Sequence, residues 1–190
     1  MIESYQKLHT GRLLLTTEDA GQAPEPAAVQ ALLAGIGLVG DPLPEVTGGF
    51  ASGPRLLELI GFTGCAVQID SGTGGGSGLV HIRIEGPLPR PALKYGRNSR
   101  PPRCPGCRAA LAEWRQQVAS QTQQEPLLRC AACGATRPAT DWDWRRHAGC
   151  GRLFVSVEEV FPGEAQPLPG LLDRLVSLGA GPWRHFYVQD

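Results

Sequence analysis

The sequence has no run of 18 or more apolar residues, which argues against a transmembrane helix. Its first 21 residues carry only a short apolar patch with acidic flanks, which is not the pattern of a secretory signal. Without an export signal, we expect a cytoplasmic protein whose six cysteines are reduced thiols rather than a disulfide framework. The hydrophobic content of 42% and the charged content of 19% are typical of a folded globular protein.

Signatures of nucleotide binding and of catalysis are also missing. The glycine-rich segment 71–78, SGTGGGSG, lacks the Gly-Lys-Ser/Thr ending of a P-loop and separates two predicted strands. We therefore interpret it as a hairpin loop, since no helix N-terminus follows it to hold a phosphate. No Ser/His/Asp arrangement or cysteine nucleophile is recognisable. The sequence predicts no catalytic residue and identifies no small-molecule substrate, which favours a binding protein over an enzyme.

Lysine is scarce, because 16 of the 18 basic residues are arginine. Residues 81–152 hold 13 basic and 5 acidic residues, whereas the remainder of the chain holds 5 basic and 13 acidic residues. A basic middle inside an acidic frame suggests either an anionic partner or docking of one half of the protein on the other. Composition alone leaves both interpretations open.

Apolar periodicity indicates an α+β fold. We expect helices at 26–36 and 168–179, where apolar residues recur every three to four positions. Strands are predicted at 65–70, 79–85, 151–160 and 183–189, where apolar and polar residues alternate. The resulting fold is a small, mainly antiparallel sheet covered by helices. A central position for the strand 183–189 would make the C-terminus intolerant of truncation.

The most specific motif is two cysteine pairs, CPGC at 104–107 and CAAC at 130–133. Two residues between cysteines let both sulfurs turn toward one ion, and zinc prefers four such ligands in a tetrahedron. The alternatives are unpaired buried cysteines or a thioredoxin-like redox pair, but neither pair begins a helix in a βαβ unit. We therefore predict that one structural Zn²⁺ per chain is held by Cys104, Cys107, Cys130 and Cys133.

This spacing, Cys104-x2-Cys107-x22-Cys130-x2-Cys133, resembles the knuckle pairs of zinc ribbons, except that Arg108 stands where a glycine often follows the first knuckle. The resemblance covers about residues 100–140 and implies a closed zinc site without a catalytic role. We expect an inserted zinc-ribbon module at 100–140 within a core domain formed by 1–99 and 141–190. Between the knuckles, the sequence predicts a helix with Leu111, Trp114 and Val118 on one side.

Zinc ribbons recur in proteins that bind nucleic acid or assemble on larger machines, and this one is rich in arginine. The leading hypothesis is a nucleic-acid-binding module, and the alternative is a protein–protein adaptor. A third interpretation is an enzyme with a pocket near residues 141–150. His147 and Cys150 could also supply a second metal site, completed by Cys65 or His185. The residues that we predict to contact a nucleic acid or protein partner are Arg97, Arg100, Arg103, Arg108, Trp114 and Arg115.

Overall fold

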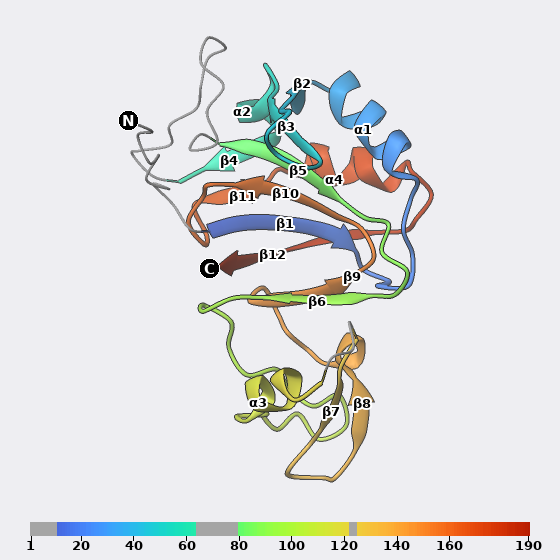
Figure 1. Ribbon diagram of the computed structural model, residues 1–190, viewed down its shortest axis with the longest axis vertical. Helices are drawn as coiled ribbons and strands as arrows, with labels where there is room; N and C mark the ends of the chain where they lie inside the picture. Colours follow the sequence, from blue (N-terminus) through green and yellow to red (C-terminus); the bar gives the residue numbers. More distant parts are fainter. Residues whose placement is uncertain (1–10, 64–79, 122–124) are drawn as a thin grey trace.

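A six-stranded antiparallel sheet dominates the computed structural model, which describes residues 11–63, 80–121 and 125–190 (Figure 1). Its strand order is β12-β1-β10-β5-β3-β2. The bounds are β1 Gly11–Thr17, β2 Val39–Pro42, β3 Gly49–Ser52, β5 His81–Glu85, β10 Phe154–Glu158 and β12 Trp183–Gln189. Two short strands, β4 (Ile60–Phe62) and β11 (Ala165–Pro167), form a separate antiparallel pair. A large antiparallel sheet with a few helices confirms the mixed fold class.

Strand β1 lies inside the sheet, between β12 and β10. Leu13 and Leu15 are both fully buried and pair with Val157 and Val155 of β10. Leu14, on the opposite face, is also buried. The sequence reasoning assigned no strand here, because three consecutive leucines do not alternate with polar residues. A strand that is covered on both faces has a continuous apolar run instead.

Helices pack against one face of the sheet (Figure 1). The helix α1 (Pro26–Gly35) buries Val29 and Leu33, and α4 (Pro169–Val176) buries Leu171 and Leu175. These four side chains join one hydrophobic core with the sheet residues on that face. Each helix has a proline in its first turn, where the missing N–H donor costs nothing. A third short helix, α2 (Leu56–Leu59), precedes β4.

A two-stranded ribbon, β6 (Ala92–Tyr95) with β9 (Ala148–Gly151), packs against the other face of the sheet. The approach is so close that a Cβ at Gly149 would lie 2.5 Å from the Phe186 ring. A Cβ at Gly151 would lie 2.1 Å from the hydroxyl oxygen of Thr16. The glycines of the AGCG segment are therefore required by packing, since any larger residue would push the ribbon away from the sheet.

The chain leaves the ribbon at the end of β6 and returns at β9, and the intervening residues 96–147 form what we term the cysteine module (Figure 1). The module contains α3 (Trp114–Ala119), β7 (Leu127–Arg129), β8 (Thr136–Pro138) and the 3-10 turn η1 (Ala139–Asp141). Its buried side chains form a second hydrophobic cluster, which includes Leu111, Trp114, Leu128, Trp142 and Trp144. The domain boundaries predicted at 99/100 and 140/141 remain predictions.

Three sequence expectations differ from the structure or lie outside it. The strand β12 is an edge strand of the six-stranded sheet rather than a central one. Its free edge is covered by the module, since Tyr187 N–H donates to the carbonyl of Arg146 (3.1 Å) and Gln189 N–H to the side-chain oxygen of Asn98 (2.9 Å). Between the knuckles, the helix among the described residues is limited to α3. The strand expected at 65–70 and the hairpin loop expected at 71–78 lie outside the described residues. None of the helices in the described residues has the length and apolar character of a membrane span.

Candidate metal centre

The four cysteine sulfurs converge at the tip of the two knuckles. All four ligand atoms lie within 4.8 Å of one another, with 3.7 Å between the sulfurs of Cys104 and Cys133 and 3.6 Å between those of Cys107 and Cys130. A zinc–sulfur bond of about 2.3 Å in a tetrahedron gives sulfur–sulfur edges of about 3.8 Å. The spacing of the sulfurs is therefore compatible with a single tetrahedral ion.

The two knuckles have the same backbone hydrogen bonds. Four residues after each first cysteine, an N–H donates back to its carbonyl, from Arg108 to Cys104 and from Gly134 to Cys130, both at 2.9 Å. The N–H of each first cysteine donates in turn to an alanine carbonyl five residues later, also at 2.9 Å. Each turn directs its two sulfurs toward the shared centre. The sequence difference between CPGC and CAAC does not change this geometry.

The knuckles also differ in the residue that follows the second cysteine of each pair. Both Gly134 (φ 73°) and Arg108 (φ 64°) have the left-handed backbone conformation, which glycine adopts without strain and arginine does not. The Arg108 guanidinium forms an ion pair with Asp143 (3.3 Å), and the Arg103 guanidinium donates to the Arg108 carbonyl (3.3 Å). The departure from the zinc-ribbon pattern at Arg108 is thus accommodated by contacts with neighbouring chain segments.

The environment of the sulfurs favours a thiolate at Cys104. The backbone amide of Cys107 lowers the Cys104 pKa to about 6, with further hydrogen bonds from Gly106, Cys130 and Cys133 outweighing the desolvation of the sulfur. The Cys107 pKa is raised to about 12, because the other three sulfurs and desolvation outweigh the hydrogen bond from the Ala109 backbone. Cys104 therefore ionises before Cys107, and binding of a cation would displace the proton of Cys107.

Two glutamine side chains, Gln117 in α3 and Gln121 just after its end, attach this segment to β7. The Gln117 amide accepts from the backbone N–H of Arg129 (2.8 Å) and donates to its carbonyl (3.1 Å). The Gln121 amide does the same for Leu127, at 2.9 Å and 2.8 Å. The two amides, one helical turn apart, satisfy the edge of β7 that does not face β8. The sequence reasoning missed both residues, because glutamines at i and i+4 on a helix are common on solvated faces.

Other groups from the sequence analysis do not form a second metal site among the described residues, where the only group with metal-binding spacing is that of the four cysteines. His147, Cys150 and His185 are not part of it, and Cys65 lies outside the described residues. Cys150 is 1% exposed, and burial raises its pKa to about 12. A protonated thiol among tryptophans behaves as a small apolar side chain.

The unusual segment 141–150 contributes mainly packing. Trp142 and Trp144 are buried in the cluster of the cysteine module, and the Trp144 indole N–H donates to the Ala139 carbonyl at 2.8 Å. Asp143 binds Arg108, as described above. Desolvation, and then the charges of Arg100 and Arg145, lower the His147 pKa. These contacts correspond to tryptophans that stabilise the module and to one carboxylate, Asp143, that pairs with an arginine.

Trp114 corrects one expectation about partner contacts. Its side chain is 2% exposed and lies between Tyr95 and Trp144, with ring centroids 5.1 Å away on each side. The Arg115 guanidinium lies 4.4 Å from the Trp114 ring centroid and donates to the carbonyls of Gly96 (2.6 Å) and Ser99 (3.1 Å). Trp114 is therefore a core residue that cannot stack on a base, and Arg115 attaches α3 to the chain segment that follows β6.

The other predicted contact residues, Arg97, Arg100, Arg103 and Arg108, are all exposed. Arg115, also predicted and described above as a structural contact, is exposed as well. Four arginines that the prediction did not include complete a set of nine exposed arginines within residues 96–147, and these are Arg129, Arg137, Arg145 and Arg146. Four carboxylates lie in the same range, and two of these are engaged by Thr140 and Arg108. The exposed side of the module thus carries an excess of positive charge.

Comparison of the whole chain with protein-family models, with curated proteins and with solved structures found no match. The four-cysteine cluster is compatible with a zinc-ribbon-like motif, and its function must be inferred from its own geometry and surroundings.

Proposed function

We propose that the protein binds one structural Zn²⁺ through Cys104, Cys107, Cys130 and Cys133, and that the cysteine module presents its arginines to nucleic-acid phosphates. The observation that supports the metal is the convergence of four sulfurs at tetrahedral spacing. Four thiolates leave no open coordination position, so the ion stabilises the module rather than catalysing a reaction. A reducing compartment such as the cytoplasm would keep these thiols available.

The nucleic-acid part of the proposal rests on the nine exposed arginines of residues 96–147. The guanidinium groups of Arg100, Arg129, Arg137, Arg145 and Arg146 make no hydrogen bond or ion pair with the described residues, so their donors are available to a ligand. Arginine donates two parallel hydrogen bonds to a phosphate, and several such contacts bind a phosphate backbone with little sequence preference. Because Trp114 is buried, we expect no preference for unpaired bases.

Elemental analysis of protein purified without chelator tests whether the protein binds zinc. We expect about one zinc per chain, a ratio fixed by the four-ligand site. Protein with all four thiols free and no transition metal would contradict the proposal.

Titration of labelled single- and double-stranded oligonucleotides at low and at physiological salt tests whether the protein binds nucleic acid. We expect similar affinity for both forms and a steep loss of affinity with salt. The charge reversals Arg100→Glu and Arg145→Glu, both beside His147, should weaken binding at least tenfold when combined. The matched control is Arg174→Glu, an exposed arginine on α4, which should leave binding unchanged.

Absence of binding at low salt, or binding that ignores the reversals in the module, would contradict the nucleic-acid proposal. The protein–protein adaptor would then be the better hypothesis. The zinc measurement is independent of this outcome, so the two parts of the proposal fail separately.

A further inference from the structure

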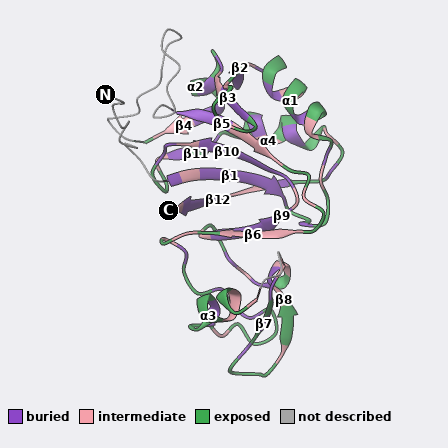
Figure 2. Cartoon of the chain, in the orientation of Figure 1, coloured by how far each residue is buried: buried purple, intermediate pink, exposed green. Residues whose placement is uncertain are grey.

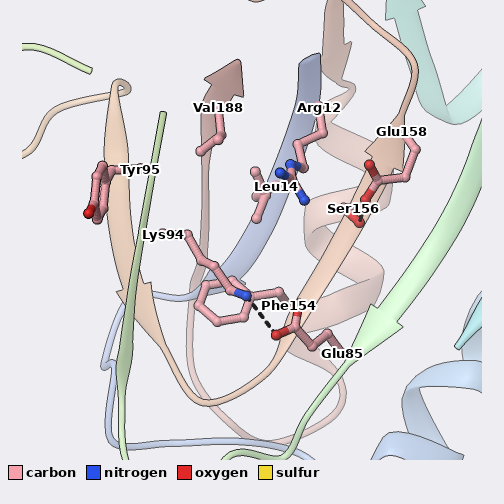
Figure 3. A pocket seen from close by; sticks show the side chains of 9 residues that line it. All are labelled: Arg12, Leu14, Glu85, Lys94, Tyr95, Phe154, Ser156, Glu158 and Val188. Carbon is pink, nitrogen blue, oxygen red and sulfur yellow. Dashed lines mark hydrogen bonds and ion pairs between the residues drawn. The ribbon is translucent and has the colours of Figure 1, made fainter. Parts of the chain in front are cut away.

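The sheet face that lies against β6 contains a cleft of about 80 Å³ (Figure 3). Its floor consists of side chains that are at most 5% exposed, which are Leu14, Phe154, Ser156 and Val188. Its rim carries two cations, Arg12 and Lys94, and two carboxylates, Glu85 and Glu158. Three of the four floor side chains are apolar, and the charged groups lie around them at the rim. Apolar contact together with a few convergent polar groups is typical of a small-molecule site.

The rim charges are arranged as neighbouring pairs of opposite sign. Lys94 Nζ lies 2.6 Å from a Glu85 oxygen and 5.3 Å from the Phe154 ring centroid (Figure 3). Arg12 is directly opposite Glu158 in the pairing of β1 with β10 and forms an ion pair with Asp190 through one guanidinium nitrogen. One Glu158 oxygen accepts from the Ser156 hydroxyl at 2.5 Å.

These contacts leave binding capacity at the rim. The other guanidinium nitrogens of Arg12 and the second carboxylate oxygens of Glu85 and Glu158 have no hydrogen bond with the described residues. The side chains of Arg12, Lys94 and Glu85 are 25%, 29% and 31% exposed, so each is partly withdrawn from water. Charge pairs in such partly desolvated positions interact more strongly than on an open surface.

The presence of both positive and negative charges at the rim restricts the class of ligand. A simple anion such as phosphate would be attracted by Arg12 and Lys94 but repelled by Glu85 and Glu158. A simple cation would be attracted by the two carboxylates and repelled by the two basic side chains. An uncharged apolar molecule would desolvate four charged groups without replacing their hydrogen bonds. A molecule with one carboxylate and one ammonium group, a few ångströms apart, satisfies both signs together.

The size of the cleft restricts the ligand further. A volume of about 80 Å³ holds roughly five water-sized groups, taking about 15 Å³ for each. This matches the non-hydrogen atoms of the smallest amino acids, and the apolar floor suits a methyl group better than a polar side chain.

We propose that this cleft binds a small free α-amino acid in its zwitterionic form, with the carboxylate toward Arg12 and the ammonium toward Glu158. Alanine is the probe of suitable size. This inference is independent of the nucleic-acid proposal, because the cleft lies on the sheet and none of its lining residues belongs to residues 96–147.

The test compares alanine with two derivatives that each lack one charge, alaninamide and N-acetylalanine. Thermal unfolding at about 10 mM of each compound reports binding, because a ligand that binds the folded state raises the melting temperature. We expect alanine to raise it and each derivative to have less than a fifth of that effect. NMR shifts of the Leu14 and Ser156 amides, saturating with alanine, locate the binding.

Two variants and one control connect the effect with the cleft. Arg12→Gln and Glu158→Gln should each weaken alanine binding at least fivefold, measured against the melting temperature of the same variant without ligand. Arg55→Gln removes an exposed arginine whose partner is Glu58 and should leave alanine binding unchanged. The proposal is overturned if alanine causes no saturable shift, if the derivatives act as strongly as alanine, or if both cleft variants bind alanine normally.

Discussion

The six-stranded sheet and the cysteine module differ in what stabilises them. The core of the sheet contains 22 buried apolar residues of the described chain, whereas the cluster around the module contains 11. Three of these 11 are cysteines, and three of the 11, namely Ala20, Ala148 and Cys150, lie outside residues 96–147. Sheet strands such as β1 and β12 have seven residues, and the module strands β7 and β8 have three each. Figure 2 shows the contrast, with the sheet largely buried, β8 largely exposed and α3 partly exposed.

A segment of about fifty residues with so small a core does not bury enough apolar surface to fold on its own, and small folds of this kind depend on metals or disulfides. The module adds side-chain hydrogen bonds from Gln117, Gln121 and Arg115 to the backbone. The sheet is stabilised mainly by apolar burial. The module has a smaller apolar core and depends in addition on these polar contacts and on its four cysteines.

The largest effect is expected from Cys130→Ser. Loss of one thiolate should weaken metal binding by several orders of magnitude and disorder residues 96–147, because the metal supplies much of the order of such a site. The sheet should persist, with a lower melting temperature. Hydrogen exchange would show lost protection at Leu128 and retained protection at Leu15 and Val155.

Cys150→Ala is the matched control for Cys130→Ser, since Cys150 is buried in the same cluster but is not in the four-sulfur group. It should keep the metal and the protection of the module. Unfolding of the whole chain in Cys130→Ser would show that the sheet depends on the module, and the comparison above would be wrong.

Leu15→Ala tests the sheet itself. Leu15 is fully buried between β12 and β10, and a cavity of this kind costs about 3 kcal/mol of unfolding free energy. We expect urea unfolding to show this loss, with metal content per folded chain unchanged. A matched change at the exposed Leu57 of α2, Leu57→Ala, should cost much less. Equal losses for the two variants would contradict the assignment of the core.

Gln117→Ala removes one of the amides that satisfy the edge of β7. The loss of two side-chain-to-backbone hydrogen bonds, partly replaced by water, should cost about 1 kcal/mol. Faster hydrogen exchange at the Arg129 amide would locate the effect. The exposed neighbour Gln116, changed to alanine, is the control and should leave this exchange rate unaltered.

The smallest effect is expected from Arg108→Gly. Glycine relieves a left-handed conformation that costs an arginine about 1 kcal/mol, while the exposed ion pair with Asp143 contributes only a few tenths. We expect a small gain in melting temperature. Arg108→Ala, which loses the ion pair but keeps the strain, should be less stable than the native protein. A glycine variant less stable than the native protein would show that the contacts of Arg108 outweigh its strain.

The residue types and spacings determined the local features of this protein. The two CxxC pairs predicted the convergence of four sulfurs, because a tight turn with two intervening residues fixes the direction of both side chains. The apolar periodicity at 26–36 and 168–179 predicted α1 and α4, since a helix covered on one face needs that repeat. These predictions succeed because the signal lies within a few residues of the structure that it specifies.

Only the tertiary structure decided which residues are covered by distant parts of the chain. The three leucines of β1 gave no strand signal until neighbours on both faces explained their burial, and β12 lies at an edge that the cysteine module covers. Trp114 has the sequence appearance of a contact residue, but Tyr95 and Trp144 enclose it. The cleft brings together β1, β5, β6, β10 and β12, from Arg12 to Val188. No local pattern encodes such contacts, because burial is set by chain segments far away in the sequence.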